Sequence, residues 1–233
     1  MKKSIKARFK EIPGRERSQY LMLALLPLVV VGGYFCPRIG FIVVLLILLF
    51  MVLASRRGRI YCGWLCPMGA FHERLLSRES LNKPIPLFFK TPWFRWGLFI
   101  IMMGFMSFRL FATEGDPIAI GHVFRTMWII SVLLAVMTGI YLKPRFWCSV
   151  CPMGTLQGVL SKNTHLLSLD DSCIECRKCE KVCPIGTYPG AYKVAGKIAQ
   201  IPSGECLRCS NCIVNCPKDA LSFKDRISGS NGS

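Results

Sequence analysis

Two cysteine-rich stretches decide how the rest of this sequence is interpreted: CIECRKCEKVCP at residues 173–184 and CLRCSNCIVNCP at residues 206–217. Each has the form C-x2-C-x2-C-x3-C-P, the spacing that wraps a chain around a cubane [4Fe–4S] cluster. Where two such runs share a domain, the fourth cysteine of each ligates the other cluster. The spacing therefore predicts two ligand sets: Cys173, Cys176, Cys179 and Cys216 for cluster one, and Cys206, Cys209, Cys212 and Cys183 for cluster two.

Zinc sites and disulfide bonds are the alternatives for these cysteines. Thiolates are soft ligands that suit iron–sulfur clusters, and they also bind zinc. A structural zinc site would use two C-x2-C pairs or a mixture of cysteine and histidine, whereas this chain repeats a four-cysteine run. Thiols at this density in a reducing compartment indicate metal binding rather than disulfide bonds. We therefore predict two [4Fe–4S] clusters.

The composition indicates a membrane protein rather than a nucleic-acid-binding protein. Hydrophobic residues make up 52% of the 233 residues, the mean hydropathy is +0.40, and the apolar excess lies before residue 150. A net charge of +17 would suggest nucleic acid in a soluble protein. Here the basic residues flank apolar segments, which is typical of contacts with anionic lipids. The sequence contains no RNP, zinc-finger or helix-turn-helix pattern, no Walker A or G-x-G-x-x-G motif, and no nucleophile triad.

Four apolar segments are candidates for membrane-spanning helices. The first two are joined, because residues 20–54 carry a single charge, Arg38. One helix of that length would extend about 50 Å, more than a hydrocarbon core of about 30 Å. Cys36 and Pro37 supply a break, with a re-entrant or shallow hairpin as the alternative to two short spans. We expect helices over residues 20–36, 39–55, 93–112 and 123–142.

Basic residues indicate which side of the membrane each span end faces. Arg56, Arg57 and Arg59 follow the second span, and Lys143 and Arg145 close the fourth. Positive charge beside a span marks the cytoplasmic side, so we expect a multi-pass protein of the cell inner (cytoplasmic) membrane with both termini and the clusters in the cytoplasm. The predicted domains are a basic cytoplasmic N-terminus (1–19), a four-span membrane domain (20–159) with a polar loop at 67–92, a 2[4Fe–4S] ferredoxin-like domain (160–226) and a disordered tail (227–233).

A repeat accounts for four of the five remaining cysteines. RIYCGWLCPMGAF at residues 59–71 resembles RFWCSVCPMGTL at residues 145–156, and each follows a pair of predicted spans. The membrane half is therefore expected to be two parallel repeats. The four cysteines could meet and hold a third metal or thiol redox centre. Alternatively, each motif is a turn at the membrane surface in which cysteine serves as a small buried hydrophobe. The residues concerned are Cys62, Cys66, Cys148 and Cys151.

Other polar residues receive less specific predictions. Cys36 is expected to be a packing residue, and Arg95 is expected to extend toward the headgroups from the start of its span. The histidines do not form a pair inside the spans, which argues against an intramembrane haem. His72 is expected to be a solvated surface residue, with a proton-accepting role at a quinol site as the alternative. Four basic residues around the cluster ligands could dock an acidic partner: Lys178, Lys181, Arg208 and Lys218.

The paired Cys-Pro motifs and the C-terminal cysteine runs together resemble the NapH/MauN family of membrane ferredoxin-type proteins, over residues 20–225. The membrane half is also similar to the C-terminal region of NosR. The family pattern has two C-x3-C-P motifs. Cys62 and Cys66 keep that spacing, whereas Cys148 and Cys151 are separated by two residues. The resemblance implies electron transfer between the membrane quinone pool and partner redox proteins.

The predicted fold class is a membrane α-helical protein, with four transmembrane helices in two parallel repeats, plus a small α+β two-cluster ferredoxin-like domain. The predicted function is an electron-transfer subunit that relays electrons between the quinone pool, or a low-potential donor, and a partner oxidoreductase, with no catalytic residues of its own. Lipid, redox partner proteins and quinone are the expected partners, and nucleic acid is not. The alternatives are a non-catalytic maturation or redox-sensing factor for a metalloenzyme, and a transmembrane thiol–disulfide carrier.

Overall fold

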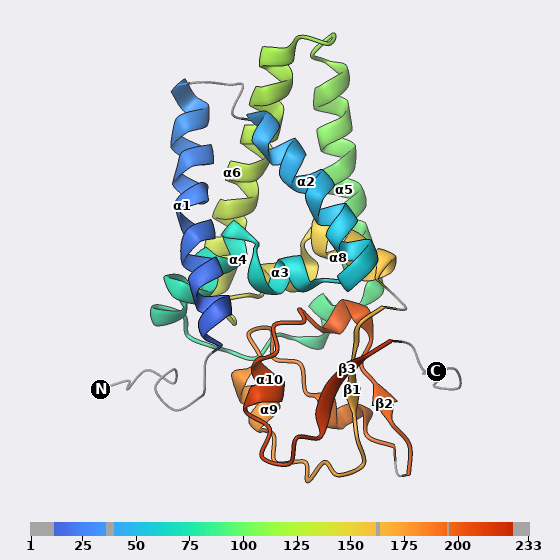
Figure 1. Ribbon diagram of the computed structural model, residues 1–233. Coiled ribbons are helices and arrows are strands. Elements are labelled where there is room, and N and C mark those ends of the chain that lie inside the picture. Colours follow the sequence, from blue (N-terminus) through green and yellow to red (C-terminus); the bar gives the residue numbers. More distant parts are fainter. Residues whose placement is uncertain (1–11, 36–39, 162–163, 195, 226–233) are drawn as a thin grey trace.

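Four long helices form one end of the computed structural model, which describes residues 12–35, 40–161, 164–194 and 196–225 (Figure 1). α1 and α5 run away from the sheet-containing end, and α2 and α6 run back toward it. The two helix pairs therefore have the same orientation, as expected of parallel repeats. The predicted break at Cys36 and Pro37 lies outside the described residues. The bounds of the long helices are Pro13–Phe35 for α1, Gly40–Arg57 for α2, Pro92–Phe111 for α5 and Pro117–Tyr141 for α6.

Two of the long helices begin earlier than predicted, and their first residues explain why. α6 begins at Pro117 rather than at residue 123, because the Asp116 carboxylate accepts hydrogen bonds from the backbone N–H groups of Ile118 and Ala119 at 3.1 and 3.2 Å. These bonds satisfy N–H groups that the first helical turn leaves free. α1 begins at Pro13 rather than at residue 20, so part of the predicted basic N-terminus is helical.

α5 and α6 have the length and composition of membrane spans. Pro92–Phe111 and Ile118–Tyr141 have mean hydropathies of 1.4 and 1.9. Their outward side chains are large and apolar, and the side chains of α2 that the structure describes continue this surface. A water-soluble protein seldom exposes so extensive an apolar surface, whereas lipid covers it. Exposed examples are Ile100, Ile101, Phe105, Phe108, Leu133 and Met137, with Leu45, Leu48 and Val52 on α2.

Short helices form a layer between the long helices and the sheet (Figure 1). α3 (Ile60–Trp64) and α4 (Pro67–Arg74) come from the first repeat, and α7 (Trp147–Val150) and α8 (Pro152–Leu160) come from the second. Proline starts both α4 and α8, where its missing N–H costs nothing. The predicted polar loop at 67–92 is wrong in part, because α4 and two 3-10 turns, Leu76–Arg78 and Leu87–Lys90, occupy much of it.

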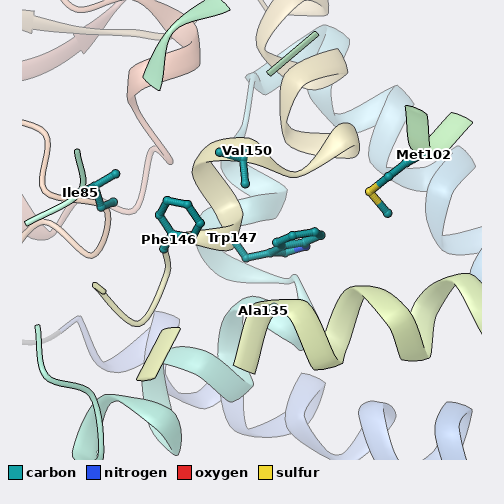
Figure 2. Packing of buried hydrophobic residues seen from close by; sticks show 6 residues of the cluster. All are labelled: Ile85, Met102, Ala135, Phe146, Trp147 and Val150. Carbon is teal, nitrogen blue, oxygen red and sulfur yellow. The ribbon is translucent and has the colours of Figure 1, made fainter. Parts of the chain in front are cut away.

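A buried apolar cluster joins this layer to the long helices. Figure 2 shows Trp147 of α7 at its centre, between Phe146 and Met102 of α5, with Val150 and Ala135 of α6 nearby. Trp147 is 5% exposed and Ala135 is fully buried. Burial of a large aromatic ring contributes strongly to stability, so this cluster fixes α7 against α5 and α6.

The C-terminal part contains a small antiparallel sheet with strand order β2-β1-β3. Ser168 of β1 pairs with Gln200 of β2 on one side and with Ser222 of β3 on the other. The mostly helical chain with a small sheet confirms the coarse α and α+β prediction. The elements of this part are β1 (Leu166–Leu169), α9 (Lys178–Val182), the 3-10 turns Pro189–Tyr192 and Ser203–Glu205, β2 (Ala199–Gln200), α10 (Asn211–Val214) and β3 (Leu221–Lys224).

Three arginines connect the sheet-containing part to the membrane half. Arg59 donates to the Gly204 carbonyl at 2.7 Å, and Arg95 forms an ion pair with Glu205 at 2.6 Å. Arg208 is 1% exposed, lies against Gly58 just after α2, and donates to the Ser161 carbonyl at the end of α8. Two predictions were therefore wrong: Arg208 is buried rather than available to dock an acidic partner, and Arg95 pairs with a carboxylate instead of extending toward the headgroups. Arg59, expected only to mark the cytoplasmic end of a span, is also buried. The sequence showed that these arginines carry positive charge, but it did not show their partners, which lie more than 40 residues away along the chain.

Gly63 marks a close backbone approach between the two parts. A Cβ atom at this position would lie 2.4 Å from the Leu207 carbonyl oxygen and 3.2 Å from the Cys209 Cα. Backbone atoms cannot move aside as a flexible side chain can, so only glycine fits here. The polypeptide around Cys209 therefore rests directly on α3.

Gly63→Ala is expected to lower the free energy of unfolding by about 1–3 kcal/mol, the usual cost of overpacking a close contact. Thermal unfolding and limited proteolysis of the detergent-solubilised protein would measure the loss. Gly104→Ala is the control, since nothing lies within 4 Å of its Cβ position in α5. Equal stability of the two variants would contradict the contact.

Candidate functional site

The structure gathers the eight cysteines of the two C-terminal runs around two cavities. Both cavities are partly open to solvent. Cys179 lines both, so the cavities are neighbours. The first cavity is lined by Cys173, Cys176, Cys179 and Cys216, and the second by Cys183, Cys206, Cys209 and Cys212 together with Cys179.

The thiols surround space rather than a single point. Among the described residues, no three His, Cys, Asp or Glu side chains are grouped closely enough to hold one metal ion. Tetrahedral zinc with bonds of about 2.3 Å would bring its sulfur ligands within about 3.8 Å of one another. Two neighbouring hollows, each lined by at least four thiols, suit multi-iron groups better than single metal ions.

Both cysteine runs fold around their cavities with the same backbone strain. Glu175 and Arg208 occupy equivalent positions in the first C-x2-C gaps, and both have φ near +52°. Arg177 and Ser210 follow the second cysteine of each run, with φ of 56° and 62°. Left-handed residues other than glycine are costly and gather at functional sites. Their recurrence in both runs indicates that each loop is wound to turn its cysteines toward one centre.

Backbone N–H groups also point at the sulfur atoms of this part. The Thr187 N–H donates to Cys183 Sγ, and the Arg208 N–H donates to Cys206 Sγ, both at 3.3 Å. Such donors stabilise negative charge on sulfur, and hydrogen bonds to the sulfurs are one control on cluster potentials.

The second group of cysteines meets in the layer of short helices. Cys62, Cys66, Cys148 and Cys151 come from both repeats, and all six pairs among them interact electrostatically. Burial raises the pKa of the Cys66 thiol to about 12, with Cys62 and Cys151 adding to the effect. Burial likewise raises the pKa of Cys148. The repeats therefore bring these four thiols together.

Each repeat contributes one arginine that holds the backbone of the other. Arg59 donates to the Cys148 carbonyl at 2.7 Å, and Arg145 donates to the Cys62 carbonyl at 2.8 Å. Both guanidiniums lie against a glycine of the opposite Cys-Pro-Met-Gly sequence, since a Cβ on Gly154 would lie 2.5 Å from Arg59 and one on Gly69 would lie 3.0 Å from Arg145. The exchange fixes the first cysteine of each motif relative to the other repeat.

A buried charge group lies between these thiols and the second cavity. Glu73 pairs with Arg15 at 2.5 Å and with Arg145 at 2.8 Å, and Arg15 also donates to the Gly63 carbonyl at 3.0 Å and to Asn211 Oδ1 at 3.2 Å. Burial alone would raise the pKa of Glu73, but Arg145 and Arg15 outweigh it and lower the pKa to about 2. The group ties α1 and α4 to the loop that carries Cys209.

His72 and Gln157 occupy equivalent positions, six residues after the second cysteine of each motif, and both are buried. The prediction of a solvated His72 was wrong: it is 1% exposed, its Nδ1 lies 2.5 Å from the Met68 carbonyl, and burial lowers its pKa. Gln157 was not singled out from the sequence. Its Oε1 accepts a hydrogen bond from the Cys62 thiol at 3.0 Å. Extending the alignment of the repeats by one residue would have paired it with His72.

Comparisons with known proteins agree with this site. A family described as "4Fe-4S binding domain" matches residues 39–84 and 124–168, the stretches that contain the Cys-Pro motifs, and "4Fe-4S dicluster domain" matches residues 165–217. An uncharacterized protein of Methanocaldococcus jannaschii is 30% identical, over 83% of this chain and 80% of its own length.

Two relatives in Escherichia coli carry more informative names. The ferredoxin-type protein NapH is 24% identical over 78% of this chain and 67% of its own length. YccM, whose name provisionally assigns it to electron transport, is 26% identical over 78% of this chain and 55% of its own length. No solved structure matches the chain.

The apolar helices and the cysteine-lined cavities define a membrane-associated iron–sulfur protein of the ferredoxin type with a role in electron transfer. With these relatives and family matches, the chain belongs to the NapH-like family of 4Fe-4S membrane proteins.

Glu73→Gln is expected to destabilise the protein by about 3–5 kcal/mol, because it leaves Arg15 and Arg145 buried without a counter-charge. In the wild type the folded-state pKa of about 2 lies below the ordinary value of 4.5, so this stabilisation is present above pH 4.5 and is lost as the pH falls toward 2. Thermal unfolding at several pH values would measure both effects. Glu79→Gln, at an exposed position nearby, is the control, and an equally small change in both variants would refute the role of Glu73.

Proposed function

We propose that this protein is a membrane-bound relay that exchanges electrons between the quinone pool, or a low-potential donor, and a partner oxidoreductase. The observation that carries the proposal is the succession of three four-cysteine sets from the exposed end of the molecule to the membrane layer. Cys176 of the first set is exposed, Cys209 of the second is buried, and the third set lies in the layer of short helices.

In this proposal, cluster one is held by Cys173, Cys176, Cys179 and Cys216, and cluster two by Cys206, Cys209, Cys212 and Cys183. The lining of the two cavities supports this exchange of the fourth cysteine between runs. When bound, [4Fe–4S] clusters supply one-electron transfer, and the protein adjusts their potentials through hydrogen bonds, charge and exposure. The chain's part is to hold the thiolates, to supply N–H donors at Cys183 and Cys206, and to limit access of water to the second set.

We further propose that Cys62, Cys66, Cys148 and Cys151 hold a third centre. Cys62, Cys66 and Cys148 belong to the same packed cluster as Cys183 of the second set, with Leu207 and Ile185 between the two parts. The α3 backbone at Gly63 also meets the backbone at Leu207 and Cys209. The third set is therefore close enough to the second to continue the path toward the membrane.

In this proposal the protein lies in the inner (cytoplasmic) membrane and crosses it four times, with α1, α2, α5 and α6. The sheet-containing domain and both termini lie in the cytoplasm. The parallel helix pairs and the outward apolar side chains support it. Arg56 and Arg57 at the end of α2 are exposed on the side that faces the sheet, as the distribution of positive charge around membrane spans requires of the cytoplasmic side. The proposed domains are those expected from the sequence: 1–19, 20–159, 160–226 and 227–233.

Anaerobically purified protein is expected to contain about twelve irons per chain, four for each cubane. Cys216→Ser and Cys183→Ser should each lower the count to about eight and remove different EPR signals, because the two cysteines belong to different sets. Cys36→Ser is the control that keeps all the iron. Colourless protein that contains zinc would overturn the proposal, and about eight irons in the wild type would limit it to two clusters.

Replacing all four cysteines of the third set with serine is expected to abolish reduction of the remaining clusters by a quinol analogue in proteoliposomes. Reduction by dithionite should persist, since the C-terminal sets are unchanged. If quinol never reduces wild-type clusters while iron content is full, the maturation or redox-sensing role becomes the better account. The thiol–disulfide hypothesis instead predicts a wild-type protein in which the third set holds no iron.

A further inference from the structure

Gln157 presents an unsatisfied hydrogen-bond donor beside the third set of cysteines. Its side chain is 0% exposed, and its Oε1 accepts the Cys62 S–H at 3.0 Å. Its Nε2 has no hydrogen-bond partner among the residues that the structure describes. Buried amide groups in native proteins are almost always bonded, so a buried N–H without a partner points to a group that completes the site.

The amide of Gln157 can serve Cys62 in either of two states. A protonated thiol donates, and the carbonyl end of the amide accepts that hydrogen, as in the structure. A thiolate bound to metal has no hydrogen and can only accept. Turning the amide by half a rotation exchanges its oxygen for its NH₂ group within the same volume, and the unpartnered N–H then meets the sulfur. The N–H of Gln157 therefore lacks a hydrogen-bond partner only while Cys62 is a protonated thiol.

Tyr61 presents a second donor of the same kind, from the other repeat. It is 3% exposed, and its hydroxyl lies beside the Cys66 thiol, with no other hydrogen-bond partner in the described part of the chain. The ring stacks on Phe50 with centroids 3.3 Å apart, which holds it in place. It packs in the buried cluster that contains Cys62, Cys66 and Cys148. Each repeat thus brings one buried donor to the shared thiols.

We propose that Gln157 and Tyr61 are positioning residues of the third centre, donating hydrogen bonds to its sulfurs and raising its reduction potential. The inference rests on the proposed third centre. Reduction adds one electron, so the reduced state has more negative charge on sulfur, and a hydrogen-bond donor stabilises it more than the oxidised state. A packing role alone would leave the potential unchanged.

The test is an EPR-monitored redox titration of the full-length protein in lipid nanodiscs, with Gln157→Met and Tyr61→Phe. Both changes nearly keep the side-chain shape and remove the donor. At a fixed potential, the ratio of reduced to oxidised third centre is expected to fall by up to about tenfold, which is about 59 mV for one electron. Iron content and the midpoints of the other two clusters should stay constant.

The controls are the same exchanges at positions away from the third set, Gln200→Met in β2 and Tyr20→Phe on α1. Unchanged midpoints in both test variants, with about twelve irons bound, would overturn this inference and leave the relay intact. About eight irons in the wild type would instead remove the third centre itself. If one test variant fails to accumulate, the other supplies the comparison, because the two donors belong to different repeats.

Discussion

The exchange of arginines between the repeats is the contact on which the membrane half depends. Arg59 and Arg145 are each 1% exposed, and each donates to the carbonyl of the first cysteine in the opposite motif. A guanidinium taken out of water needs several acceptors to offset its lost hydration. The carbonyls of the other repeat, Glu73 and Gly204 supply them. Neither repeat can therefore bury its arginine alone, and the four thiols assemble as a consequence of the pairing.

The same layer joins lipid-facing helices to the cluster-binding part. Gly63 touches the backbone at Leu207, Arg15 bridges α1 and Asn211, and Arg95 pairs with Glu205. These contacts are short and largely buried, which limits relative motion of the two parts. Electron transfer between neighbouring centres requires a fixed separation. The buried ion pairs and arginine–carbonyl contacts hold that separation, which explains why the layer keeps buried charges despite the free-energy cost of removing them from water.

Sequence patterns predicted the family, the iron–sulfur chemistry and the mainly helical fold, because cysteine spacing and apolar length report local geometry. They were less successful with polar side chains. His72 and Arg208 were predicted to be surface residues, since histidine and arginine are usually solvated, and nothing in the sequence indicated that Arg59 is buried. Their burial depends on acceptors supplied by segments far away in the chain. Helix starts were also missed, because the Asp116 cap and Pro13 lie outside the apolar periodicity.

Cysteine spacing along the chain was enough to predict the two C-terminal cysteine sets, because all ligands of a run lie within one short loop. The packing of the two repeats brings Cys62, Cys66, Cys148 and Cys151 into one layer and places Gln157 and Tyr61 beside them, which the sequence did not show. The physical reason is that spacing constrains ligands within one loop, whereas a site shared between two repeats is set by how their buried charges and helices pack together.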